Sequence, residues 1–210
     1  MGRKSIAPLR KLEILEAYEA SIKEVGFAQS TTRKIAEIAG IKQPMIAHYF
    51  GNREALVEAL VQRIIEKYMS ELQAQIGALK GRERLQHCML FLFGSGVLGE
   101  DTSGSLIGHL LSAAKQDDTV QKHMKAMYAL FTQLCFEELH LAFPSAPTGI
   151  CQSTAYGIIC LTVGNDAILS TGLPYINREK AQYCATQLIK ALEFEAQRES
   201  QQESQQEAQS

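Results

Sequence analysis

The sequence predicts an all-α protein, because apolar residues recur at helical spacing along most of its length. Between Leu12 and Val25 they follow three- and four-residue steps, which place them on one face of a helix. No segment alternates apolar and polar residues between turn signals, which is the pattern of a half-buried strand. Of the 210 residues, 46% are hydrophobic and 21% are charged, so the chain can bury a sizeable core.

Glycines and capping residues bound the first four expected helices. Glycine often follows the end of a helix because it adopts the left-handed conformation at little cost. The first three helices are expected to end or break at Gly26, Gly40 and Gly51. The next three starts are marked by residues that cap or tolerate a first turn: Ser30 or Thr31, Pro44, and Asn52. The fourth helix carries apolar stripes to about Ile76.

Further helices are expected over the rest of the chain, near residues 82–93, 104–114, 118–142, 148–171 and 177–195. Their start signals are Asp117 or Asp118, Pro147 with Thr148, and Asn177. Residues 197–210 repeat Gln, Glu and Ser with nothing to bury, so we expect this tail to be disordered.

Charge is divided unevenly along the chain, although the net charge is only −2. Residues 1–53 contain nine Lys and Arg against five Asp and Glu, which gives +4. Residues 54–210 contain twelve against eighteen, which gives −6. A basic N-terminal segment suggests a polyanionic partner. No apolar run approaches the roughly 20 residues that a membrane span needs, and no secretory signal is visible, so we expect a soluble cytoplasmic protein.

Residues 30–60 hold the most informative pattern, two short helices with a tight turn at Gly40 and then a capped long helix. This is the helix-turn-helix arrangement, whose second helix enters the major groove and presents its first residues to base edges. The residues in that position are Lys42, Gln43, Pro44 and Met45. Gln pairs with adenine, Lys with guanine or phosphate, and apolar atoms contact the thymine methyl group. Alternatively, such a helix pair can belong to a purely structural bundle.

The patterns T-T-R-K-I-A, A-G-I, Q-P-M-I-A-H-Y-F and N-R-E-A-L, spread over about residues 8–65, resemble those of tetracycline-repressor (TetR) family regulators. The resemblance implies that Thr32, Tyr49 and Arg53 contact phosphates. It also implies that Arg33 contacts guanine, Gln43 adenine and Pro44 a thymine methyl group. The full set expected to contact DNA, here called the recognition set, is Thr31, Thr32, Arg33, Lys42, Gln43, Pro44, Met45, His48, Tyr49 and Arg53.

Two positions depart from the family pattern. Ala47 stands where the family often has a tyrosine that holds a phosphate, so that contact is absent or replaced by Tyr49. Met45 stands where a small hydroxyl residue is common, so we expect the operator to differ from a tetracycline operator.

The resemblance also implies a domain organisation and a mechanism. Residues 1–53 would form a three-helix, helix-turn-helix DNA-binding domain, and residues 54–196 a larger helical domain for ligand binding and dimerisation. Half-sites about 34–36 Å apart need two recognition helices, which a homodimer through the last two long helices would supply. We expect a repressor that binds double-stranded palindromic operator DNA and is released by a small molecule.

The effector would bind among residues 82–140, which are rich in Met, Phe and His. Ligand pockets are mostly apolar with a few polar groups, and the same residues can equally form plain core. The candidates for ligand contacts are Cys88, Phe91, His109, Met124, Met127, Tyr128 and Phe131. His109 and Tyr128 would be the polar members, and the ligand an apolar or amphipathic molecule.

Two further functions compete with this interpretation. Residues 94–99, GSGVLG, match a dinucleotide-binding fingerprint, but that motif needs a βαβ unit and no second strand is visible. A redox sensor could use Cys88, Cys135, Cys151, Cys160 or Cys184, although none has Lys or Arg within two residues. The spacing of the cysteines and histidines predicts no zinc site, and we expect no catalytic residues, metal or cofactor.

Overall fold

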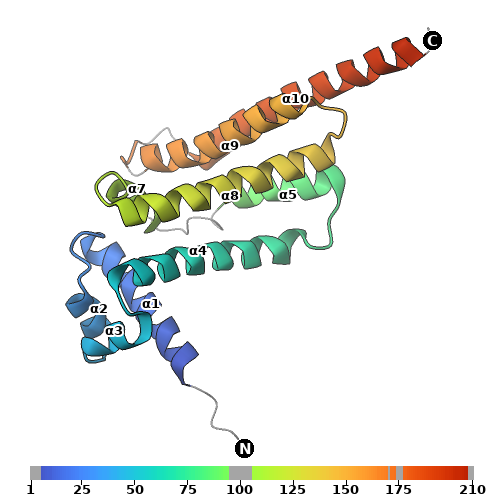
Figure 1. The fold of residues 1–210 in the computed structure, drawn as a ribbon. Helices are drawn as coiled ribbons and strands as arrows, with labels where there is room; N and C mark the ends of the chain where they lie inside the picture. The colour runs from blue at the N-terminus through green and yellow to red at the C-terminus, as the bar shows by residue number, and fades with distance from the viewer. Residues whose placement is uncertain (1–5, 95–105, 170, 174–176, 208–210) are drawn as a thin grey trace, which may run out of the picture. The chain divides into compact units, whose positions relative to one another are not determined.

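The computed structural model of the chain describes residues 6–94, 106–169, 171–173 and 177–207, and no strand occurs in these ranges (Figure 1). The helices are α1 (Ala7–Val25), α2 (Thr32–Ile38), α3 (Pro44–Phe50), α4 (Arg53–Ile76), α5 (Gly81–Phe93), α7 (Leu106–Ala113), α8 (Asp118–Ala142), α9 (Thr148–Leu169) and α10 (Arg178–Glu207). The predicted all-α fold is therefore confirmed. The glycine-rich segment proposed as a dinucleotide loop lies, from residue 95 on, outside the described residues.

The helices group into two compact units. The first contains the described residues of Met1–Lys67 and Ser103–Met127, and the second those of Tyr68–Thr102 and Tyr128–Ser210. The boundaries fall inside α4 and α8, so each of these helices contributes to both units. Contacts thus group α7 and the start of α8 with the N-terminal helices. The domain boundary at residue 53 follows from sequence signals alone and stays a prediction.

Local signals position the helices of the first unit as expected. The Thr31 Oγ1 accepts a hydrogen bond from the backbone N–H of Lys34 at 3.2 Å and caps α2. The Asn52 Oδ1 accepts one from the backbone N–H of Ala55 at 2.8 Å at the start of α4. Gly26 ends α1 with a φ of 79°, a conformation that other residues rarely adopt. These caps give partners to backbone groups that a helix end would otherwise leave unpaired.

The core of the first unit is built from apolar residues of α1, α2, α4, α7 and α8, whereas Leu12, which begins the predicted stripe of α1, is 37% exposed. The largest fully buried side chains of this core are Ile14, Tyr18, Ile22, Ile35, Leu56, Leu60, Leu110 and Met127. Ile46 of α3 is also buried, with 3% of its surface exposed, and it is the only buried residue of that seven-residue helix. Burial of this one side chain leaves the first turn of α3 facing outward.

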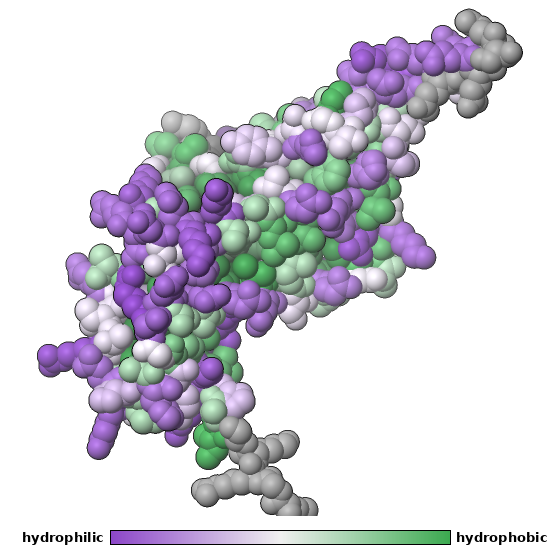
Figure 2. Space-filling view, in the orientation of Figure 1, coloured by the Kyte–Doolittle hydropathy of each residue, from purple (hydrophilic) through white to green (hydrophobic). Residues whose placement is uncertain are grey.

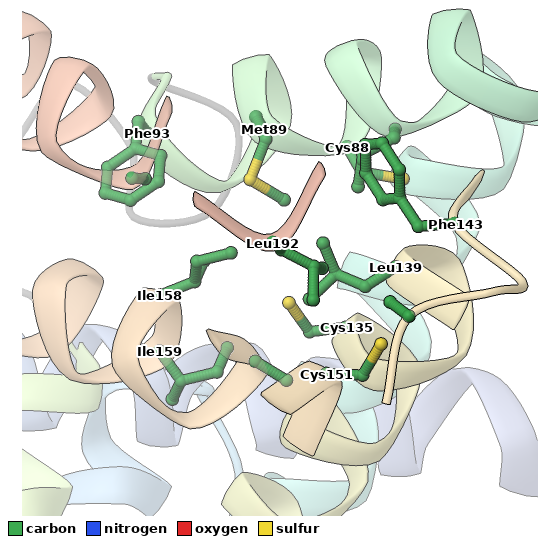
Figure 3. Packing of buried hydrophobic residues seen from close by; sticks show 14 of the residues in the cluster. Cys88, Met89, Phe93, Cys135, Leu139, Phe143, Cys151, Ile158, Ile159 and Leu192 are labelled. Carbon is green, nitrogen blue, oxygen red and sulfur yellow. The ribbon is translucent and has the colours of Figure 1, made fainter. Parts of the chain in front are cut away.

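The second unit has a separate apolar core (Figure 3). Side chains from α5, α8, α9 and α10 meet in it, and the labelled members are Cys88, Met89, Phe93, Cys135, Leu139, Phe143, Cys151, Ile158, Ile159 and Leu192. The guanidinium of Arg84 binds both carboxylate oxygens of Glu138 at 2.7–2.9 Å and the carbonyl of Ile76 at 3.1 Å. Arg84 thereby ties the end of α4 to α5 and α8.

Helices α9 and α10 run side by side within the second unit (Figure 1). They approach closely at Gly157, where an added Cβ would lie 3.2 Å from the Leu188 Cδ1. Several large apolar side chains of the two helices stay exposed: Tyr156, Ile168, Tyr183, Leu188 and Phe194. The pair therefore buries one face in the core and leaves further apolar surface uncovered.

The C-terminal segment differs from the expectation of disorder, because α10 continues to Glu207. The residues near the end of α10 are themselves hydrophilic (Figure 2). Gln and Glu are good helix formers, and the segment contains neither Gly nor Pro. A lack of apolar residues removes tertiary packing but not helix propensity, and the expectation considered only the packing. No helix in the described ranges is long and apolar enough to cross a membrane.

Candidate nucleic-acid interface

The recognition set comes from the first turns of α2 and α4, from the residues just before α2 and α3, and from both ends of the short helix α3. Eight of its ten members are exposed, and Thr32 and Tyr49 are half-buried. Gly40, with a φ of 64°, makes the turn after α2. Because Ile46 alone anchors α3, Gln43, Pro44 and Met45 face solvent. These are the side chains that a recognition helix presents to base edges.

A hydrogen bond joins two members of the recognition set across the turn. The Gln43 Nε2 donates to the Thr32 Oγ1 at 2.9 Å. The bond uses one amide N–H and leaves the other N–H and the Oε1 of Gln43 for a base. It also leaves the hydroxyl hydrogen of Thr32 for a further acceptor, such as a phosphate oxygen. Thr32 can thus orient Gln43 while making its own contact.

A cavity of about 240 Å³ opens beside this hydrogen bond. It lies between the starts of α2, α3 and α4 and is lined by Thr32, Gln43, Pro44, Ile46, Ala47, Gly51, Asn52, Arg53 and Leu56. Ala47 lines it where the family often has a tyrosine, so the smaller side chain leaves this space open. Thr32, Gln43, Asn52 and Arg53 supply the polar part of the lining, and most of the remaining lining surface is apolar.

Arg53 stands at the start of α4 with several partners. Its guanidinium carbon lies 5.1 Å from the ring centre of Phe27. Its Nη1 lies 2.8 Å from the Oδ2 of Asp117. Burial opposes ionisation of the Asp117 carboxyl, but the backbone N–H of Val120 and the Arg53 guanidinium outweigh it and hold the pKa of Asp117 below its usual value. Arg53 is 53% exposed and remains accessible.

His48 and Tyr49, two further members of the recognition set, lie on α3. The rings of His48 and Tyr49 meet edge to face, with centroids 5.1 Å apart. The Lys11 Nζ lies 5.6 Å from the centre of the Phe50 ring and adds a cation beside the end of α3. Sequence reasoning did not include Lys11, although its place in the basic N-terminal segment could have suggested it.

The predicted effector contacts are not brought together within one unit. His109, Met124 and Met127 belong to the first unit, and Cys88, Phe91, Tyr128 and Phe131 to the second. Four of the seven, Phe91, Cys88, Met124 and Met127, are buried among apolar neighbours. This is the environment that plain core residues also have. Their role as ligand contacts stays a prediction.

The sequence analysis did not single out two partly or fully shielded polar side chains, His123 in the first unit and Asp166 in the second. Among the described residues, the His123 Nε2 is shielded from solvent and has no hydrogen-bond partner. Burial raises the pKa of Asp166 to about 6, and Arg178, whose Nε lies 4.0 Å from the Oδ1, opposes this. Burial also raises the pKa of Tyr128 to about 12, and the charge of Asp166 adds to the effect. Buried polar groups of this kind are the usual anchors of a ligand.

The five cysteines are reduced, and they fall into two classes. Cys88, Cys135 and Cys151 are buried, whereas Cys160 and Cys184 are exposed. Burial raises the pKa of Cys88 to about 11 and that of Cys135 to about 12, so both stay protonated and unreactive at neutral pH. The described residues hold no cluster of three or more His, Cys, Asp or Glu side chains that could bind a metal ion.

Comparison with known proteins places the N-terminal helices in a defined group. Residues 14–60 match the family model described as bacterial regulatory proteins, tetR family. The chain is 34% identical over 80 residues to the HTH-type transcriptional regulator BetI 2 of Chromohalobacter salexigens. That match covers 38% of this chain and 39% of the relative, so the chain spans well under half of that relative's length.

Solved structures extend the likeness to almost the whole fold. A transcriptional regulator from Pseudomonas aeruginosa PAO1 superposes with a TM-score of 0.76 at 19% identity, over 93% of this chain and 95% of the other. A regulator from Saccharomonospora viridis, solved in complex with choline, gives a TM-score of 0.72 at 16% identity, over 87% and 96% of the two chains. At such identities the likeness is one of fold.

Proposed function

Because residues 14–60 match the tetR family model, we propose that the chain is a ligand-responsive repressor of that family. In this proposal a homodimer binds a palindromic operator and a small molecule releases it. One observation carries the proposal: Thr32, Gln43 and Arg53, from the starts of α2, α3 and α4, line one cavity, and eight of the ten residues expected to contact DNA are exposed.

The recognition set divides into residues that would read bases and residues that would bind phosphates. Gln43, just before α3, and the exposed Arg33 of α2 would read base edges in the major groove. Thr32, Tyr49 and Arg53 would bind phosphates and set the register. The hydrogen bond of 2.9 Å between Gln43 and Thr32 supports this division, because it connects a base-reading amide to a phosphate-binding hydroxyl.

The homodimer would form through the exposed apolar surface of α9 and α10. Tyr156, Tyr183 and Phe194 are 64–65% exposed, although such side chains are normally buried. Aromatic residues are enriched at protein interfaces. A symmetric dimer would cover this surface and supply the two recognition helices that an operator with two half-sites needs.

The effector would be an apolar or amphipathic small molecule bound by the helical part of the chain after α4. Within the second unit, the half-buried Asp166 and the neighbouring Tyr128 support polar anchoring of such a ligand. The choline complex of the Saccharomonospora viridis regulator makes choline a reasonable first compound to test. His109 and Tyr128 remain the two polar residues predicted to contact it.

A thiol-based redox sensor is the second candidate, and the exposed Cys160 and Cys184 are the observation that favours it. Both lie on the helices proposed to dimerise, so alkylation there would disturb the dimer as well as report on accessibility. A protein whose DNA binding survives full alkylation of its accessible thiols would exclude the redox mechanism.

The proposal is tested by fluorescence anisotropy on DNA from upstream of the protein's own gene, or on duplexes selected from random sequence. Binding should weaken linearly with the logarithm of salt concentration, because phosphate contacts release counterions. Arg33→Ala should reduce the preference for the operator over random duplex. Arg82→Ala, which removes an exposed arginine outside the recognition set, serves as the matched control. Equal affinity for selected and random DNA would contradict the proposal.

A further inference from the structure

The Arg53 side chain is held by a carboxylate at the place where the proposed function needs a phosphate. We propose that Asp117 competes with the DNA phosphate for Arg53, so that the start of α8 lowers the affinity of the protein for DNA. The inference rests on the proposed phosphate contact of Arg53. It assigns to Asp117 a role in DNA binding that needs no contact between Asp117 and DNA.

The Asp117 carboxylate is fixed by the helix that it caps. One oxygen, Oδ1, accepts a hydrogen bond from the backbone N–H of Val120 at 3.0 Å, in the first turn of α8. The other oxygen, Oδ2, lies 2.8 Å from the Arg53 Nη1. The Asp117 side chain is only 23% exposed, against 53% for Arg53. The acceptor is therefore the fixed partner of the pair and the guanidinium is the more accessible one.

Asp117 and a phosphate would compete for the Nη1 of the Arg53 guanidinium. Carboxylate and phosphate accept the same parallel N–H donors of an arginine edge. Phe27 covers one face of the Arg53 guanidinium, with 5.1 Å between the guanidinium carbon and the ring centre, which restricts its reorientation. A phosphate that binds at the Nη1 now facing Asp117 must displace the carboxylate. The carboxylate then stays as an unpaired negative charge beside a polyanion, which opposes binding.

A second ion pair connects the same two helices. The Lys122 Nζ lies 3.5 Å from the Glu54 Oε1, the residue that follows Arg53. Two ion pairs thus join the N-terminal ends of α4 and α8. The cation belongs to α4 in one pair and to α8 in the other. Both pairs lie within the first compact unit. A shift of α8 in register would alter the partner of Arg53 directly.

Asp117→Asn is the substitution that isolates the charge, because Asn caps helices as well as Asp does. The matched control is Asp118→Asn, which removes the same charge one residue further on, where the side chain is exposed. The probe is a mixed-sequence duplex, whose binding depends on phosphate contacts. Asp117→Asn should bind it about threefold more tightly per protomer, the range expected for an exposed ion pair. The slope of log affinity against log salt should steepen by up to about 0.9 per protomer.

Arg53→Ala, made alone and together with Asp117→Asn, completes the experiment as a double-mutant cycle. The account predicts that Asp117→Asn gains nothing once Arg53 is absent. An equal gain from Asp118→Asn, a gain that persists without Arg53, or weaker binding by Asp117→Asn would each overturn the competition. Arg53→Ala that leaves DNA affinity unchanged would instead remove the proposed phosphate contact. Thermal unfolding of each variant checks that the cap and fold are retained.

Discussion

The two compact units of this chain place their functional side chains differently relative to their cores. In the first unit the candidate DNA contacts are polar residues that the apolar stripe of each short helix leaves outside. The second unit holds four of the seven candidate ligand contacts, and of these Cys88 lies inside the core while Tyr128 and Phe131 pack against it. In the first unit, the helical spacing of apolar residues distinguishes the candidate DNA contacts from the core. In the second unit it cannot, because core residues and candidate ligand contacts share the same spacing and the same apolar character.

The largest expected effect concerns the second unit, through its uncovered apolar surface. Phe194→Glu places a charge on a side chain that is 64% exposed on α10. A homodimer through α9 and α10 should dissociate, and operator affinity should fall by about 100-fold or more because the second half-site loses its tether. Light scattering gives the mass and anisotropy gives the affinity.

Leu141→Glu is the matched control for that experiment. Leu141 is 69% exposed on α8, so it is as apolar and as accessible as Phe194 but lies outside the proposed interface. The control should remain dimeric and bind DNA normally. A Phe194→Glu protein that stays dimeric would move the interface away from α10.

The next effect concerns the first unit and the identity of the operator. Gln43→Ala should weaken operator binding by about 10- to 100-fold per half-site, since a bidentate base contact contributes about 1–3 kcal/mol. Binding to random duplex should change little. Gln62→Ala removes an exposed glutamine on α4, whose Nε2 donates to the Glu66 Oε1 at 3.1 Å, and should leave both affinities unchanged. Loss of affinity for both DNAs alike would make Gln43 a phosphate contact.

Much of the first unit could be predicted because its signals are local. Gly26 ends α1, Thr31 caps α2 and Asn52 caps α4, and each signal lies within four residues of the group that it satisfies. The start of α10 was predicted for the same reason, since the Asn177 Oδ1 accepts a hydrogen bond from the Lys180 N–H at 3.0 Å.

The rest depended on contacts between distant parts of the chain. The Arg53–Asp117 pair joins residues 64 positions apart, and no periodicity connects them. The partial burial of Asp166 depends on how α9 packs in the second unit, so the raised pKa could not be inferred from a lone acidic residue. Residues 197–207 are helical because their helix propensity is high. The expectation of disorder rested on their polarity alone.

Asp166 also gives the second unit a dependence of stability on pH. Its pKa of about 6 in the folded protein lies above the ordinary value of 3.8, so the folded state holds the proton more tightly than the unfolded state does. The free energy of unfolding should therefore decrease by about 2 kcal/mol as pH rises from roughly 4 to 6, and then stay constant as far as this group is concerned.

Asp166→Asn should remove this dependence and raise the stability above pH 6, because the amide carries no charge to bury. Urea unfolding at a series of pH values measures the difference between the two proteins. Asp118→Asn, at an exposed carboxylate, controls for the loss of a charge. Parallel pH profiles for the wild type and Asp166→Asn would show that Asp166 is not the titrating group.

The smallest expected effect tests the hydrogen bond between Thr32 and Gln43 in the first unit. Thr32→Val keeps the shape of the side chain and removes the acceptor that orients the Gln43 amide at 2.9 Å. Discrimination at the base that Gln43 contacts should fall about fivefold, because one neutral hydrogen bond contributes about 1 kcal/mol. Thr32→Ser should retain the discrimination. A Val variant that discriminates as well as wild type would show that Gln43 is oriented by other groups.

The central claim, sequence-specific DNA binding through α2 and α3, is tested most directly by selection of bound duplexes from random DNA, with wild type and Arg33→Ala in parallel. The account predicts that wild type selects a palindrome whose half-site centres lie about one helical turn apart. It also predicts that Arg33→Ala selects a site that is degenerate at one position in each half. Recovery of no common sequence by wild type, or of the same site by both proteins, would contradict the account.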